Sequence, residues 1–224
     1  MNGMKQFLFR VARLIAGLFL YSLGIVFTIQ ANIGYAPWDV FHAGLVKTIG
    51  VTMGMASIFV GFAIVIIVVL LGEKIGLGTV LNMLLIGAFL DMILMPSIIP
   101  LAAGFVSGVF MLAVGLFIIA FASYLYISSG FGAGPRDSLM VAITRKTKLP
   151  VGVCRAVIET AAVVIGWFLG GMAGVGTIIS AFGIGFCIQI VFRLLKFDVA
   201  AIMHETILQT IRAFLTAIRR KSRN

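Results

Sequence analysis

Six long apolar stretches alternate with short segments rich in Gly, Pro and charged residues. They cover approximately residues 8–30, 54–72, 76–96, 102–128, 153–171 and 176–195. A helix that spans a bilayer needs roughly 20 mainly apolar residues, and each stretch approaches or exceeds that length. The pattern therefore predicts an all-α, polytopic membrane protein with about six transmembrane helices.

Two further segments, 34–50 and 132–148, begin with a cluster of Gly and Pro and continue with residues that favour helix. Each is too short to cross, because about 14 helical residues span ~21 Å and a bilayer core measures ~30 Å. We therefore expect two half-helices, which either enter the membrane or lie along its surface.

The two halves of the chain resemble each other. A shift of 98 residues, without gaps, superposes them, and the matched residues are mostly Gly and Pro, which set backbone shape. Each copy contains three spans, so the second copy has the opposite orientation in the membrane. The sequence thus predicts two inverted three-helix repeats, 1–98 and 99–198, each with one half-helix. The matched pairs include Gly34 and Gly132, Pro37 and Pro135, Asp39 and Asp137, Gly54 and Gly152, Gly76 and Gly174, and Gly87 and Gly185.

Composition supports a lipid environment. Hydrophobic residues make up 62% of the chain and charged residues 11%, whereas soluble domains carry roughly 25% charged residues. The net charge of +10 would suggest nucleic-acid binding in a soluble protein, but here the basic residues flank the apolar stretches. If the N-terminus is cytoplasmic, every Lys and Arg except Lys47 falls on the inner side. We expect a multi-pass protein of the plasma membrane with both termini in the cytoplasm and no nucleic-acid partner.

Residues 199–224 have a different pattern. Apolar residues recur at helical spacing from Val199 to Ile218, and Arg and Lys crowd the later half. This predicts a cytoplasmic amphipathic helix that rests on anionic lipid headgroups. Binding of a partner protein is the alternative interpretation.

The paired motif Pro37-Trp38-Asp39 and Pro135-Arg136-Asp137 is the first candidate site. Pro suits the first turn of a helix, and a carboxylate two residues later faces the positive end of the helix dipole. The two aspartates therefore either stabilise their own helix starts or contribute to a binding site. Interrupted segments at corresponding positions of inverted halves mark the binding sites of transporters, which favours a site for a small solute or ion.

Polar residues within the spans extend the candidate site to Asn82, Asp91 and Glu159. A carboxylate at membrane depth is costly and therefore suggests function. Glu159 lies four residues after Arg155, so a local ion pair is an equally simple explanation. His42 has no counterpart in the second half, and the apolar face of its half-helix suggests that it lies at the membrane interface.

Motifs for catalysis or cofactor binding are missing. Cys154 and Cys187 match no metal or redox spacing. His204-Glu205 lacks the second histidine of a zinc protease, and no Gly-x-Ser-x-Gly elbow occurs. The Gly-x-Gly-Thr pairs at Gly76 and Gly174 lack a Walker lysine, and we interpret them as tight turns with Thr as a helix cap. We expect neither an enzyme nor a bound cofactor.

Gly34-Tyr-Ala-Pro37-Trp38-Asp39-Val40, followed by Gly76-Leu-Gly-Thr79, Asn82 and Asp91, resembles the YczE/YyaS/YitT-type bacterial membrane proteins over roughly residues 10–195. The resemblance implies a bacterial plasma-membrane protein with about six spans, and it carries no substrate.

Our leading hypothesis is a small secondary transporter or permease with its site between the two halves, which would rock against each other. The alternative is a membrane scaffold that docks partners through its basic C-terminal helix. A channel ranks third, and a homodimer is conceivable although no motif argues for it.

Overall fold

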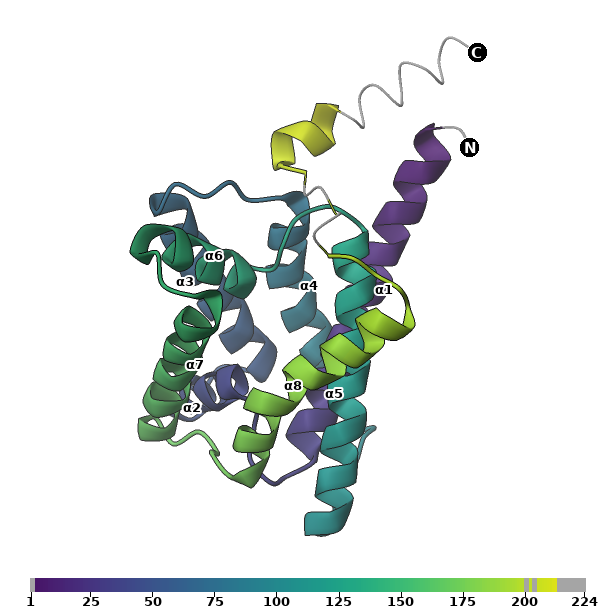
Figure 1. Cartoon of the computed structure of the whole chain (residues 1–224). Helices are drawn as coiled ribbons and strands as arrows, with labels where there is room; N and C mark the ends of the chain where they lie inside the picture. The colour runs from purple at the N-terminus through teal and green to yellow at the C-terminus, as the bar shows by residue number, and fades with distance from the viewer. Residues whose placement is uncertain (1–2, 200–201, 203–204, 213–224) are drawn as a thin grey trace.

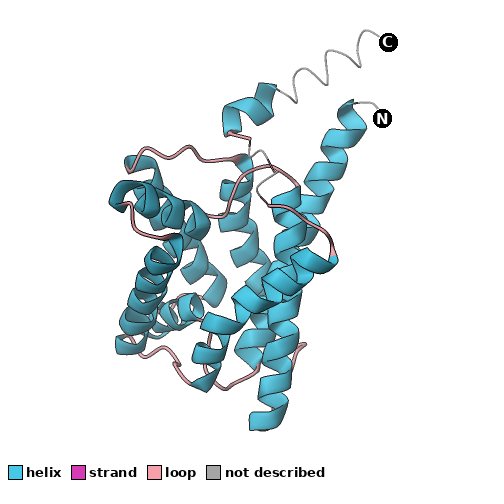
Figure 2. Cartoon of the chain, viewed as in Figure 1, coloured by secondary structure: helices cyan, strands magenta, loops and turns pink. Residues whose placement is uncertain are grey.

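The computed structural model describes residues 3–199, 202 and 205–212, and these residues form helices and connecting loops without a strand. Figures 1 and 2 show the helices side by side. The helices between residues 3 and 194 are α1 (Gly3–Gln30), α2 (Pro37–Ile49), α3 (Met53–Leu70), α4 (Leu77–Leu94), α5 (Phe105–Ser128), α6 (Pro135–Thr147), α7 (Val151–Phe168) and α8 (Val175–Leu194).

Six of these helices, α1, α3, α4, α5, α7 and α8, are long and apolar enough to cross a membrane. The expected spans are therefore confirmed, with ends that differ by a few residues. The largest difference is at the start of α1, which begins at Gly3 because the helix continues through the polar residues before the apolar stretch.

The short helices α2 and α6 occupy the two segments expected to form half-helices, and each has 13 residues. Their bounds coincide under the shift of 98 residues, as do the bounds of α3 and α7. Backbone angles agree as well: φ is 115° at Gly34 and 119° at Gly132, and 87° at Gly72 and 90° at Gly170. Local structure thus follows the sequence similarity between the halves.

The helices pack in two groups. In the first group, α1 packs along α5, α4 packs on α1, and α8 packs on α5. In the second group, α2 packs on α7, α3 packs on α6, and the half-helices α2 and α6 each pack on the long helix that follows them, α3 and α7. Each group takes helices from both halves of the chain, and Figure 1 shows the first group beside the second. The main contact between the groups is the packing of α3 along α4.

An extended segment precedes each half-helix and crosses the start of a span from the other half. The Gly176 N–H at the start of α8 donates to Ile33 O at 2.7 Å, and the Gly78 N–H at the start of α4 donates to Phe131 O at 2.8 Å. A Cβ on Gly176 would lie 2.5 Å from Gly34 O, so only glycine permits the crossing. These two crossings fix where the half-helices begin.

The described part of the C-terminal tail returns to the start of α1. Arg10 forms a 2.7 Å ion pair with Glu205, whose N–H donates to Gly130 O at 2.9 Å. Residues 207–212 are helical. The prediction of a helix that begins at Val199 is wrong over its first part, because the described residues 199, 202, 205 and 206 are not helical. Residues 200, 201, 203, 204 and 213–224 lie outside the described residues.

The glycine crossings predict a contrast between two glycines of α8. Gly176→Ala should lower the free energy of unfolding by about 1–3 kcal/mol, because the added methyl overlaps Gly34 O. Gly185→Ala places its methyl where no atom lies within 4 Å and should be neutral or stabilise the helix by up to about 1 kcal/mol. Thermal unfolding of both variants in detergent measures the difference. Equal stabilities would contradict the assignment of Gly176 to a close crossing.

Candidate functional site

The starts of the two half-helices meet in the centre of the molecule. The Arg136 guanidinium of α6 lies 4.9 Å from the centroid of the Trp38 ring of α2. The same guanidinium approaches α2 a second time, with Nη2 3.3 Å from His42 Nε2. The half-helices therefore turn their first residues inward, toward each other.

Asp39, His42 and Arg136 form a connected polar network. His42 Nδ1 lies 3.2 Å from Asp39 Oδ1, and the two side chains are 1% and 5% exposed. A guanidinium can only donate, so Nε2 of His42 accepts from Arg136 and its Nδ1–H donates to Asp39. The network links the buried Asp39 carboxylate to the partly exposed Arg136 guanidinium through a buried imidazole, which offsets the cost of burying the carboxylate.

The interpretation of His42 as an interfacial residue was wrong. The structure buries the side of α2 that carries Pro37, Asp39 and His42. The polar residues of this helix face inward because α6 supplies them with a partner, Arg136. The amphipathic pattern of a helix predicts that its polar residues face water, and it gives no information about a polar partner on another helix.

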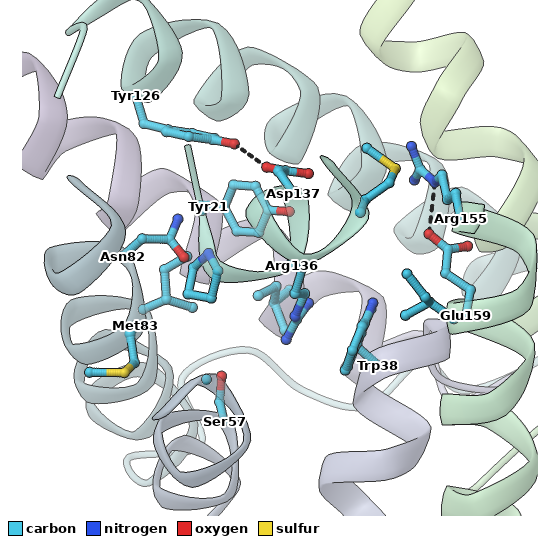
Figure 3. Close-up of a pocket in the computed structure, with 17 residues that line it drawn as sticks. Tyr21, Trp38, Ser57, Asn82, Met83, Tyr126, Arg136, Asp137, Arg155 and Glu159 are labelled. Carbon is cyan, nitrogen blue, oxygen red and sulfur yellow. Dashed lines mark hydrogen bonds and ion pairs between the residues drawn. The ribbon is translucent and has the colours of Figure 1, made fainter. Parts of the chain in front are cut away.

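A cavity of about 130 Å³ lies where the half-helices meet, and Figure 3 shows Trp38, Arg136 and Asp137 around it. Tyr126 of α5 donates from its hydroxyl to Asp137 Oδ2 at 2.8 Å. On the α7 side, Arg155 and Glu159 form an ion pair at 2.8 Å. The polar side chains that line the cavity are Tyr21, Trp38, Ser57, Asn82, Tyr126, Arg136, Asp137, Arg155 and Glu159.

Most of the residues predicted from the sequence meet at this cavity. Its lining includes Trp38, Asn82, Pro135, Asp137 and Glu159. Pro37 and Asp39 line a smaller adjoining cavity of about 90 Å³, which shares Tyr21, Trp38 and Arg136 with the first. The Arg155–Glu159 ion pair considered from the sequence is present, and both of its members face the cavity.

Asp91, which was predicted to belong to the site, lines neither of these two cavities. Its Oδ1 accepts from the Gly54 N–H at 2.7 Å, and its Oδ2 accepts from the Thr52 hydroxyl at 2.5 Å. Thr52 is the N-cap of α3, so both carboxylate oxygens bind the start of that helix. Asp91 thus joins the end of α4 to the start of α3, which satisfies a carboxylate and a helix terminus together.

Tyr21 and Tyr126 are cavity residues that the sequence did not indicate, and Arg136 was named only as part of the Pro135–Asp137 motif, without a role of its own. The two tyrosine rings lie 6.2 Å apart at 76°. Neither tyrosine is matched in the other half, so the repeat gave no signal for them. Arg136 stands between Pro135 and Asp137, and an arginine inside a motif already suspected of binding was the signal that could have identified it.

Among the described residues, no group of three or more His, Cys, Asp and Glu is arranged to hold a metal ion. Around the cavity, aromatic hydroxyls, one amide, two guanidiniums and two carboxylates are present. These groups are suited to binding a small polar molecule by hydrogen bonds and charge.

Comparison with known proteins identifies the family. Residues 8–193 match a family of unknown function, DUF6198. The chain belongs to this family. It is 37% identical over 168 residues to the uncharacterised membrane protein YczE of Bacillus subtilis, covering 74% of this chain and 77% of YczE. The resemblance seen in the sequence is therefore confirmed.

Two other relatives extend the comparison of this DUF6198 protein. An uncharacterised protein of Haemophilus influenzae is 31% identical over 179 residues, which cover 80% of this chain and 81% of that protein. The uncharacterised protein YyaS of B. subtilis is 28% identical over 167 residues, which cover 73% and 83% of the two chains. No solved structure matches.

The network in this DUF6198 protein predicts a selective role for His42. His42→Leu should reduce stability by about 1–3 kcal/mol, because it leaves Asp39 and Arg136 without their shared partner. His42→Gln retains a donor and an acceptor and should recover part of that loss. Thermal unfolding of both variants provides the measurement. Equal losses would show that His42 contributes volume rather than hydrogen bonds.

Proposed function

We propose that this protein is a small secondary transporter or permease. The observation that carries the proposal is the meeting of two interrupted half-helices at a polar cavity between two helix groups. Inverted halves with interrupted helices that start at a central site are the arrangement on which many secondary transporters depend. A polar cavity inside an apolar helical protein also has a cost that a purely structural role does not explain.

The size of the cavity favours a small solute. Its volume of about 130 Å³ lies below the roughly 300–1,000 Å³ of pockets that hold drug-sized ligands. A small metabolite or an ion would fit such a space, whereas a lipid or a peptide would not.

The charges favour a solute that carries an anionic group and a cationic or donor group. Arg136 uses one N–H on His42 and stacks on Trp38, which leaves donors directed at the cavity. Asp137 accepts from Tyr126 and retains a free oxygen. Arg136 and Asp137 form no ion pair with each other, although they are neighbours on α6. A solute with an anionic group for Arg136 and a cationic or donor group for Asp137 would satisfy both.

Alternating access would come from motion between the two helix groups. The first group holds α1, α4, α5 and α8, and the second holds α2, α3, α6 and α7. Each group combines helices from both halves, so we propose that the groups, rather than the sequence halves, move against each other. The half-helix starts would remain near the centre of this motion.

We propose a bacterial plasma-membrane location with both termini in the cytoplasm. The start of α1, the α3–α4 connection and α6 lie at one end of the molecule (Figure 1), and this end carries Lys5, Lys74 and Arg145. Lys47 lies on α2, at the opposite end. The positive-inside rule places the first of these ends in the cytoplasm.

A ligand screen tests the transporter proposal. Purified protein should be stabilised by a subset of small zwitterions, by about 2.7 kcal/mol at a hundred times the dissociation constant. Arg136→Met should remove this stabilisation, because the solute loses its anionic contact. Arg145→Met is the matched control: Arg145 lies on the same helix, but its side chain is 68% exposed and pairs with Glu73. Thermal-shift assays followed by uptake into proteoliposomes provide the measurement.

The scaffold alternative predicts the opposite pattern. Deletion of residues 213–224, which removes most of the basic residues of the tail and keeps the Arg10–Glu205 ion pair, would then abolish activity in cells, and substitutions in the cavity would have little effect. Under the transporter proposal, the Arg136 variant loses uptake and the deletion retains it.

A further inference from the structure

The two halves differ most in the contact between their second and third long helices. In the first half, α3 packs along α4, and this contact is the main connection between the two helix groups. The equivalent helices of the second half, α7 and α8, do not pack along each other in this way. Since the individual helices have equivalent bounds, the difference lies in how they are placed rather than in how they fold.

Glycines show how close the first contact is. A Cβ on Gly54 would overlap Gly87 O, and a Cβ on Gly87 would lie 2.5 Å from Gly54 O. The equivalent residues of the second half are Gly152 and Gly185, and a Cβ on either would meet no atom within 4 Å. Mid-helix glycine reduces helix stability by about 1 kcal/mol relative to alanine. In this structure Gly87 packs closely against Gly54, whereas Gly185 lowers helix stability without making such a contact.

A crevice occupies the space between α7 and α8. Its volume is about 400 Å³, and its walls include Gly152, Ala156, Ala181 and Phe182. Arg155 and Glu159 line both this crevice and the central cavity. The crevice therefore leads toward the site, whereas the equivalent route on the other side is closed by the contact between Gly54 and Gly87.

Resting on the proposed function, we infer that the protein adopts a second conformation in which α7 closes on α8 through Gly152 and Gly185, while α3 separates from α4. The crevice between α7 and α8 is one route to the cavity, and the space opened between α3 and α4 is the other. Gly152 and Gly185, which match Gly54 and Gly87 in the repeat, form the closing surface of the second state. In the second state, α7 and α8 pack as α3 and α4 do in this structure, and α3 and α4 are apart as α7 and α8 are here.

Asp91 holds the present state. It binds the Gly54 N–H and the Thr52 hydroxyl across the α3–α4 contact. At the equivalent positions the second half has Gln189, the Gly152 N–H and Pro150. In the second state, the neutral Gln189 amide would accept one hydrogen bond, from the Gly152 N–H, because Pro150 has no hydroxyl. The Asp91 carboxylate accepts two, and charge-assisted hydrogen bonds are about twice as strong as neutral ones. This difference favours the conformation with α3 on α4.

Cysteine cross-linking tests the second conformation. In a Cys154→Ala/Cys187→Ala background, we would introduce Pro150→Cys and Gln189→Cys, whose counterparts Thr52 and Asp91 are joined by a hydrogen bond of 2.5 Å. Closure would bring the two thiols within disulfide range. The control pair is Pro150→Cys with Ile190→Cys, because Ile190 is 45% exposed and lies about 100° around α8 from Gln189. Oxidation in membranes should give an intramolecular disulfide several-fold faster in the first pair.

Two further variants establish how closure occurs. Adding Asp91→Asn to the first pair should increase the rate of cross-linking, because it weakens the contact that holds α3 on α4. Adding Gly152→Leu should abolish cross-linking while leaving thermal stability intact, because the side chain fits the open crevice but blocks its closure.

The outcomes separate this inference from the proposed function. Equal cross-linking of the test and control pairs, no effect of Asp91→Asn, or a disulfide between two copies of the chain would overturn the second conformation. Cross-linking that follows the predicted pattern without uptake of any solute would retain the second conformation and reject the transporter.

Discussion

The structure depends on one constraint: a helix that begins inside an apolar protein must find partners for its first N–H groups and for the extended chain before it. Lipid offers no hydrogen bonds, so interrupted backbone is tolerated only where protein or a water-filled cavity surrounds it. Here each extended segment is placed against the start of a span from the other half, through Ile33 with Gly176 and Phe131 with Gly78. Glycines at the crossings allow this approach, and the positions of both half-helices follow from it.

The polar cavity is a consequence of that arrangement. Once the half-helix starts meet, their first-turn residues share a small volume, and each charge needs a partner. His42 joins Asp39 to Arg136, Tyr126 binds Asp137, and Arg155 binds Glu159. The arrangement gives each of these charges a partner yet leaves donors and an acceptor directed at the cavity. This incomplete pairing is the basis of the proposed solute site.

Local features could be predicted from the sequence, and long-range partners could not. Apolar length identified the six spans, and the Gly-Pro clusters identified both half-helices to within a few residues, because these signals depend on nearby residues alone. The packing of α2 on α7 and the burial of His42 depend on contacts with distant parts of the chain, which periodicity does not encode. Asp91 illustrates the same limit: its cost in the membrane suggested a function, but its partners, Thr52 and Gly54, lie on another helix.

The central claim is that the half-helix starts enclose a cavity that water and solutes reach from outside. Ser57 lines this cavity from α3, whereas Ser123 is buried within α5 and bonded to Ile119 O. Thiol accessibility in a Cys154→Ala/Cys187→Ala background would compare Ser57→Cys with Ser123→Cys, using a small, charged, membrane-impermeant reagent on vesicles of both orientations. The account predicts that Ser57→Cys reacts, that the solute found by ligand screening slows the reaction, and that Ser123→Cys stays unreactive. A Ser57→Cys thiol that stays unreactive from both sides would contradict it.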